Sequence, residues 1–208
     1  GLGLFHNIDA EKKKISKLMY EVQRDSLTGL FNKSALEYLV ATAIENSSAS
    51  VSHAFIIVDL DDFKSVNDGC GHPYGDVILQ GLSEILNTVF HKDDIISRIG
   101  GDEFVVFLNN VESRAQIAEQ LNTLVTMLKG EFFASFIKQR GFNLCVLPDK
   151  DAPSVADPIT VSCSMGGSIY PEDGKDFQTL YRSADMALYR VKGQGNFGIG
   201  FFSSDEDR

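Results

Sequence analysis

Apolar residues recur every three or four positions in some stretches of the chain and form short unbroken runs in others. The first spacing predicts amphipathic helices, and the second predicts buried strands. The predicted helices lie at about 9–24, 32–44, 75–89, 113–129 and 177–191. The predicted strands lie at about 53–59, on either side of residues 100–101, and at about 199–202. Helices interspersed with strands indicate a mixed α and β domain.

The most informative turn joins two of the apolar runs. Ile95-Ile96 and Phe104–Phe107 flank the sequence Gly100-Gly101-Asp102-Glu103. This pattern predicts a tight β-hairpin with Asp102 and Glu103 at its tip. Glycines let a phosphate approach the backbone closely, and adjacent carboxylates can hold a hard cation. An acidic surface turn explains the same residues, so the hairpin alone does not decide between the two interpretations.

A second acidic element follows the apolar run Phe55–Val58. It reads Asp59-Leu60-Asp61-Asp62-Phe63-Lys64, and strand alternation places Asp59 and Asp61 on one face. Such acids can form a Mg²⁺ site that takes one or two carboxylates together with substrate phosphates. Lys64 would add a point positive charge for phosphate. A solvated strand end is the alternative interpretation.

Together with three further blocks, these two elements make the chain resemble the GGDEF domain of the diguanylate cyclase family. The five blocks stand in the family's order over residues 25 to 202: 25–32, 59–76, 98–104, 161–166, and 184–189 with Lys192. The resemblance implies an α+β fold like that of nucleotidyl cyclases and polymerase palms. Its mainly antiparallel, ferredoxin-like central sheet would be flanked by helices, with the GGDEF motif on a β-hairpin.

The resemblance also implies a metal site. Asp59 and Asp102 would bind Mg²⁺ (or Mn²⁺) through their side chains, and the Leu60 carbonyl would complete the protein ligands. Asp61 would support this site. Asp102 or Glu103 would accept the proton of the attacking 3′-hydroxyl, and Asp102 is the expected base. A hydroxyl bound to the metal would lose its proton more readily in any case.

Further positions match residues that bind GTP in this family. Asn67 and Asp76 would recognise guanine, since a carboxylate accepts two N–H groups from the guanine edge. The remaining expected contacts to GTP, most of them to its phosphates, are Asp62, Phe63, Lys64, His72, Gly100, Gly101 and Lys192. His72 is as readily explained as a structural turn residue. Lys192 on its own would be read as a solvated surface lysine.

Two departures from the family pattern affect the prediction. The block after Lys192 lacks the usual arginine, which removes a fixed charge from the triphosphate site. Upstream of the hairpin, His91 replaces the arginine of the family's product-inhibition motif, while Asp94 is retained. Because histidine lacks the planar, always-charged guanidinium, this allosteric product site is degenerate and we expect weak or absent feedback inhibition.

The expected activity is condensation of two GTP molecules into cyclic di-GMP and two pyrophosphates by a homodimer. A catalytically silent GGDEF module that binds GTP as a sensor, or serves as a dimerisation scaffold, is the alternative. A polymerase palm is disfavoured, because a formal net charge of -10 does not suit a template groove or other nucleic acid.

The chain has 208 residues, and its three cysteines are scattered along the sequence. Reduced thiols, a cytoplasmic setting and no membrane contact by this fragment are expected, although the full-length protein could be membrane-anchored. Residues 1–24 are expected to be a signalling linker helix from a longer protein, following a sensor domain of PAS type, or a helix packed on its own domain. Residues 25–208 would form the GGDEF domain, with an insertion at about 131–158 before a family strand at 159–162.

Overall fold

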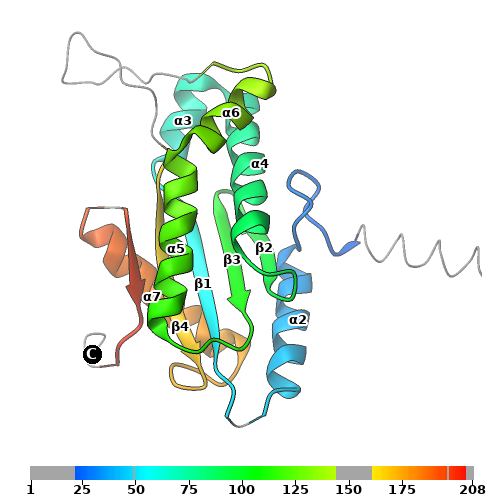
Figure 1. Ribbon diagram of the computed structural model, residues 1–208, viewed down its shortest axis with the longest axis vertical. Coiled ribbons are helices and arrows are strands. Elements are labelled where there is room, and N and C mark those ends of the chain that lie inside the picture. Colours follow the sequence, from blue (N-terminus) through cyan, green and yellow to red (C-terminus); the bar gives the residue numbers. More distant parts are fainter. Residues whose placement is uncertain (1–21, 49, 144–160, 196, 205–208) are drawn as a thin grey trace, which may run out of the picture.

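The computed structural model describes residues 22–48, 50–143, 161–195 and 197–204. Residues 1–21 of the predicted linker and residues 144–158 of the predicted insertion therefore fall outside the described residues. The helices are α2 (Lys33–Glu45), α3 (Phe63–Cys70), α4 (His72–Val89), α5 (Arg114–Lys129), α6 (Glu131–Gln139) and α7 (Phe177–Gly193). The strands are β1 (His53–Leu60), β2 (Ile95–Gly100), β3 (Glu103–Leu108), β4 (Cys163–Tyr170) and β5 (Gly198–Phe201). Figure 1 shows them in the colours of the sequence.

The five strands form one sheet in the order β2-β3-β1-β4-β5. The first three pairings are antiparallel, and only β4 and β5 run parallel. Between β1 and β4 the chain follows a β-α-β-β-α-β path, which is the ferredoxin-like arrangement. The predicted fold class, a mainly antiparallel sheet flanked by helices, is confirmed.

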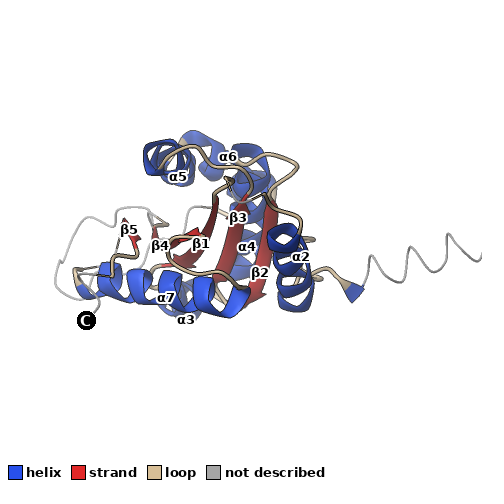
Figure 2. Ribbon diagram, turned by 90° about the horizontal axis from the view of Figure 1, so that it is seen from below, coloured by secondary structure: helices blue, strands red, loops and turns tan. Residues whose placement is uncertain are grey.

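Helices cover both faces of the sheet because β1 alternates between two apolar clusters. Ile56 and Val58 pack with side chains from α4, α5 and α6, whereas Phe55 and Ile57 pack with side chains from α2 and α7. Figure 2 shows the strands between α5 on one side and α7 on the other. A strand buried on both faces reads as a continuous apolar run, which explains the sequence at 54–58.

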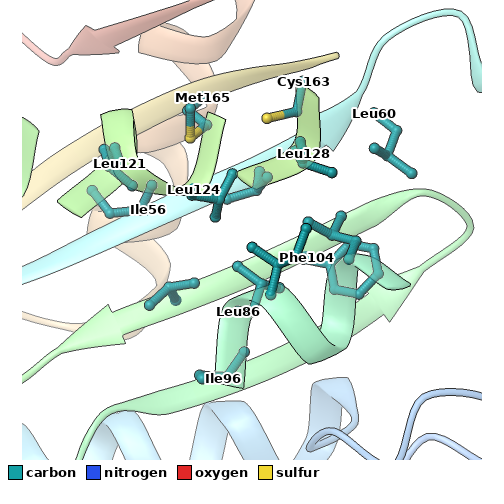
Figure 3. Packing of buried hydrophobic residues seen from close by; sticks show 14 of the residues in the cluster. Ile56, Leu60, Leu86, Ile96, Phe104, Leu121, Leu124, Leu128, Cys163 and Met165 are labelled. Atoms are coloured by element: carbon teal, nitrogen blue, oxygen red, sulfur yellow. The ribbon is translucent and has the colours of Figure 1, made fainter. Parts of the chain in front are cut away.

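The larger core lies between the sheet and the layer of α4, α5 and α6. Leu86, Leu121 and Leu124 meet Ile56 and Phe104 there, and all five side chains are fully buried (Figure 3). This packing anchors the strands whose ends carry the acidic residues. None of the helices in the described residues is long and apolar enough to cross a membrane.

Helix α4 begins earlier than the sequence predicted, and α3 was not predicted. The pattern placed the start of this helix near Gly75. Helix α4 instead begins at His72 with Pro73 in its first turn, a position that tolerates proline. Helix α3 contains Asn67, Asp68 and Gly69, which have low helix propensity. Packing of its buried Val66 in the main core therefore outweighs local preference.

Strand β4 also differs from the expected position. Of the strand expected at 159–162, residues 161 and 162 lie in the described part, and they precede β4 rather than belong to it. Ser162 instead binds the chain after β1, because its carbonyl accepts the Asp61 N–H at 3.0 Å. The segment at 131–139, whose role the sequence left open, is helix α6, and it buries Phe133 and Ile137.

The cysteines correct another expectation. Cys70 is disulfide-bonded, whereas the scattered spacing predicted reduced thiols. Sequence spacing does not report which segments the fold brings together. Cys163 is free and buried, and burial raises the pKa of its thiol to about 12.

Helix α7 approaches β4 so closely that only glycine fits between them. A Cβ on Gly166 would lie 2.2 Å from the Ala184 carbonyl oxygen and 2.3 Å from the Leu188 backbone nitrogen. Both are backbone atoms, so a side-chain rotation cannot relieve the clash. This contact fixes the position of α7, which carries Lys192 near its C-terminal end.

We therefore expect Gly166→Ala to lower the free energy of unfolding by about 3 kcal/mol, the upper part of the range for overpacking. Urea denaturation followed by circular dichroism would measure the change. Gly193→Ala is the matched control, because an added Cβ there meets no atom within 4 Å and alanine is favoured in a helix. Equal stability of Gly166→Ala and the wild-type protein would contradict the close approach.

At the opposite end of β1, His53 is buried with neutral hydrogen-bond partners. Its Nδ1 accepts the Asn110 N–H, its Nε2 bonds to the Ser47 hydroxyl, and its ring stacks on Phe107. Burial lowers the pKa of His53 below its usual value. If the ring were protonated, its own N–H at Nδ1 would face the Asn110 N–H, and the hydrogen bond would be lost.

This environment predicts that His53 weakens the fold in acid. Below a pH of about 6.5 the unfolded chain protonates this histidine before the folded protein does, so unfolding takes up protons and stability falls as the pH decreases. The slope for one proton is at most about 1.4 kcal/mol per pH unit. Urea denaturation between pH 7 and pH 5 would measure how stability depends on pH. His53→Gln should lack the part of this dependence that comes from His53. Parallel curves for the two proteins would show that His53 does not titrate abnormally.

Candidate active site

A pocket of about 460 Å³ opens where β1 ends beside the β2–β3 hairpin. Its lining comes from the end of β1, the start of α3, the hairpin and the end of α7. The lining residues are Asp59, Leu60, Asp61, Asp62, Phe63, Lys64, Asp102, Glu103 and Lys192. The two acidic elements of the sequence, about 40 positions apart, therefore meet in one place.

Sheet register brings the acids together. Strands β1 and β3 pair so that Asp59 lies opposite Glu103. One residue further along, the Leu60 N–H donates to the Asp102 carbonyl oxygen at 3.4 Å. The hairpin has a two-residue turn of Gly101 and Asp102, and Gly101 has a left-handed φ of 48° that favours glycine. Glu103 is thus the first residue of β3 rather than part of the turn.

The clustered carboxylates disturb one another's ionisation. Burial raises the pKa of Glu103, and the nearby charges of Asp59 and Asp102 raise it further. Burial also raises the pKa of Asp59, although a hydrogen bond from Lys192 opposes that shift. Perturbed carboxylates in a cleft are typical of sites that bind cations or transfer protons.

The nearest cation to this cluster is the ammonium of Lys192. Its Nζ lies 2.6 Å from Oδ1 of Asp59, whose side chain is only 9% exposed. The sequence placed Lys192 on the substrate phosphates and gave no reason to pair it with Asp59. The pairing arises because α7 crosses β4 beside the end of β1, which only the tertiary structure determines.

A serine cluster anchors the chain that follows β1. The Asp61 carboxylate accepts hydrogen bonds from the hydroxyls of Ser162, at 2.7 Å, and Ser164, at 2.6 Å. The Phe197 N–H donates to the same Ser164 hydroxyl at 3.0 Å. Asp61 thus connects β1, β4 and the loop after α7. The supporting role of Asp61 in a metal site stays a prediction, and the sequence assigned no role to the two serines.

The pocket also contains the N-terminus of α3. Asp62 precedes this helix with a left-handed φ of 52°, an uncommon conformation for a residue with a side chain. Phe63 and Lys64 form the first turn. Exposed N–H groups at a helix start, together with a lysine, suit the binding of phosphate.

The residues predicted to bind guanine, Asn67 and Asp76, and the predicted GTP contact His72 are not among the lining residues of the pocket. Asn67 is on α3, and His72 and Asp76 are in the first turns of α4. Gly75 allows the two helices to meet, because its Cβ would lie 2.0 Å from the Asn67 side-chain oxygen. Gly100 and Gly101 stand in open space at the hairpin, which leaves their backbone accessible.

His91 and Asp94 line a different pocket of about 360 Å³ beside Arg24 and Phe31. The Asp94 carboxylate accepts the N–H groups of His91, at 2.9 Å, and Asn109, at 3.0 Å. This aspartate therefore stabilises the local loop. Weak product inhibition through the degenerate pair stays a prediction.

Arg98 is a structural residue that sequence reasoning left without a role. Its guanidinium donates to the Gly101 carbonyl oxygen through Nε at 3.0 Å and Nη2 at 2.7 Å. Nη1 pairs with Asp25 at 3.1 Å. Burial opposes ionisation of Asp25, but hydrogen bonds from Thr28 and the Arg98 guanidinium leave its pKa lowered. In the sequence, the one indication of a role for Arg98 and Asp25 is that they lie in blocks 98–104 and 25–32, which resemble the GGDEF family.

The donor set fits a divalent cation that also binds substrate. Within the described part of the chain, no group of three or more acidic, histidine or cysteine side chains is placed to hold a metal ion. Mg²⁺ does not need one, since it commonly uses one or two carboxylates together with water and substrate phosphates. The protein oxygen donors for such a cation would be Asp59, Asp102 and the Leu60 carbonyl, all from residues that line the pocket.

Fold and site together define a domain with a ferredoxin-like core and an acidic pocket at the end of β1. The model of the family described as "Diguanylate cyclase, GGDEF domain" matches residues 22–143 and 149–197. The chain belongs to this family.

Known proteins support the assignment. The cyclic di-GMP phosphodiesterase PdeR of Escherichia coli is 31% identical over 93% of this chain, and the probable diguanylate cyclase DgcT of the same species is 32% identical over 83%. The chain spans 26% and 34% of those proteins. The crystallised GGDEF domain of TpbB (YfiN) from Pseudomonas aeruginosa shares the fold, with a TM-score of 0.70, 24% identity, and coverage of 88% of this chain and 96% of that one.

Arg98→Lys should loosen the hairpin, because lysine keeps the charge beside Asp25 but cannot reproduce both bonds to Gly101. Hydrogen bonds from a charged group are worth about 1.5–3 kcal/mol, so amide exchange at residues 100–103 should accelerate about tenfold or more. Hydrogen–deuterium exchange with mass spectrometry would measure this. Arg182→Lys, on the exposed surface of α7, is the matched control. Unchanged exchange in Arg98→Lys would exclude the restraint.

Proposed function

We propose that this domain is a diguanylate cyclase that condenses two GTP molecules into cyclic di-GMP and releases two pyrophosphates. The observation that carries the proposal is the meeting of Asp59, Asp102 and Glu103 in one pocket with Lys64 and Lys192. Family membership supports the same chemistry. Mg²⁺ or Mn²⁺ bound to Asp59, Asp102 and the Leu60 carbonyl would neutralise charge that develops on the phosphates.

The protein residues would position the nucleotide. The α3 N-terminus with Asp62 and Phe63, the backbone of Gly100 and Gly101, and Lys64 would hold the triphosphate. Asn67 and Asp76 would bind the guanine edge beside the pocket, with His72 nearby. Adenine would leave these polar groups unpaired, at a cost of about 1–3 kcal/mol for each buried group.

The chemical step forms one P–O bond and breaks another. The 3′-hydroxyl oxygen of one GTP attacks the α-phosphorus of the other, and the bond to the β-phosphate oxygen breaks to release pyrophosphate. A carboxylate at the hairpin takes the hydroxyl proton. Glu103 suits this role, because its raised pKa makes it a stronger base than an ordinary glutamate, and Asp102 is the other candidate. A second identical step closes the ring.

Both steps require two nucleotides face to face, and in the proposed arrangement each pocket of about 460 Å³ binds one. We therefore propose that a homodimer is the active form, with each subunit presenting its GTP to the other. A linker helix over residues 1–24 that pairs with its copy would raise the effective concentration of the second subunit. The domain would then act in the cytoplasm as the output of an upstream sensor in a bacterial signalling protein.

A GTP-binding module without turnover is the second candidate function. The absence of the usual arginine after Lys192 favours it, since one fixed positive charge is missing from the phosphate site. A relative named as a phosphodiesterase shows that such a domain occurs in proteins with another principal activity. The intact acids at positions 59, 102 and 103 favour the cyclase.

Incubation with GTP and Mg²⁺, followed by chromatography of the products, distinguishes these functions. The cyclase predicts cyclic di-GMP and pyrophosphate, and Asp102→Asn should lower the rate by about 100-fold or more, because a charge that stabilises the transition state is lost. Glu119→Gln on the exposed face of α5 is the control and should retain the wild-type rate. Bound but unreacted GTP would support the silent module, and equal rates in Asp102→Asn would refute the assigned site.

A further inference from the structure

The ion pair between Lys192 and Asp59 occupies the carboxylate that the proposed function assigns to the metal. Nζ of Lys192 lies 2.6 Å from Oδ1 of Asp59, which is a full hydrogen-bonding contact. The Asp59 side chain is 9% exposed and that of Lys192 is 39% exposed. The carboxylate is therefore fixed in the floor of the pocket, whereas the lysine reaches it from a position that is open to solvent.

The surroundings of Asp59 explain why a cation is held there. Glu103 lies opposite Asp59 in the strand register, and Asp61 and Asp102 line the same pocket. Several carboxylates at short range repel one another more strongly in a partly buried site than in water. Lys192 offsets part of this repulsion, and its ammonium takes an oxygen atom that a divalent cation would otherwise use.

Lysine is suited to leave this position. Its charge is carried by a compact ammonium on a flexible four-carbon stem, so it can exchange one anionic partner for another without moving the helix. Lys192 lies in the last turn of α7, whose position is fixed by the close contact with Gly166. Lys64, the other lysine of the pocket, forms no ion pair within the described residues, so the two lysines are not equivalent.

We propose that Lys192 is an exchangeable counter-ion that keeps free divalent cations out of the site until nucleotide arrives. In the absence of GTP, Lys192 neutralises Asp59. When a triphosphate enters, its oxygens offer Lys192 another anionic partner, and Asp59 becomes available to the cation that accompanies the nucleotide. Metal and nucleotide then bind with positive coupling, each raising the affinity for the other. This inference rests on the proposed function for the identity of the nucleotide.

The proposal predicts that Lys192→Met has opposite effects on the affinities for Mn²⁺ and for GTP. Without nucleotide, Lys192→Met should bind Mn²⁺ about tenfold more tightly than the wild-type protein, because the competing ammonium is gone. Electron paramagnetic resonance of free Mn²⁺ during a titration measures this affinity directly. With Mn²⁺ present, the same variant should bind GTP more weakly, because a phosphate contact is lost.

Three variants control the metal titration. Lys64→Met removes the same charge from the same pocket without removing the ion pair, and it should change Mn²⁺ affinity by less than about threefold. Asp59→Asn combined with Lys192→Met should abolish the gain. Lys192→Gln repeats the test if the methionine variant is unstable by circular dichroism.

Equal Mn²⁺ affinity in Lys192→Met and the wild-type protein, or an equal gain in Lys64→Met, would overturn the proposal. Its failure is distinguishable from failure of the proposed function. A gain in Mn²⁺ affinity without any GTP binding would retain Lys192 as a competitor of the cation, but it would refute both the release of Lys192 by nucleotide and the cyclase. If the wild-type protein forms cyclic di-GMP but Lys192→Met does not bind Mn²⁺ more tightly, the proposed function stands and the counter-ion proposal fails.

Discussion

The antiparallel pairing of β1 with β3 is the constraint on which the site depends. It sets Asp59 opposite Glu103 and brings the Asp102 carbonyl to the Leu60 N–H. A slip of one residue would turn every side chain of a strand to the other face, so that Phe55 and Ile57 would have to fit the space now filled by Ile56 and Val58. The core packing that fixes the register of the sheet therefore also fixes the positions of the acidic residues.

The same sheet concentrates negative charge, and the structure balances that charge with short, specific contacts. Lys192 pairs with Asp59, two serine hydroxyls bind Asp61, and Arg98 holds the turn beside Asp102. These contacts join the last helix, β4 and the hairpin around a single pocket. Residues far apart in the chain are thus held together around one pocket.

Prediction from the sequence succeeded where local pattern and burial agree. The hairpin, the long helices from α2 onward and the apolar strand β1 follow from spacing. It failed at α3 and β4, where polar residues and glycines weaken local preference. There the buried Val66 and the contact of α7 with Gly166 decide the structure.

The amino-acid sequence by itself determined which residue types carry chemistry, namely two acidic clusters, paired glycines and lysines in a recognisable order. It could not determine that Lys192 would bond to Asp59, that Ser164 would link Asp61 to Phe197, or that Cys70 would be disulfide-bonded. Such contacts depend on distances in space between segments remote along the chain. Only the packing of the helices on the sheet fixes those distances.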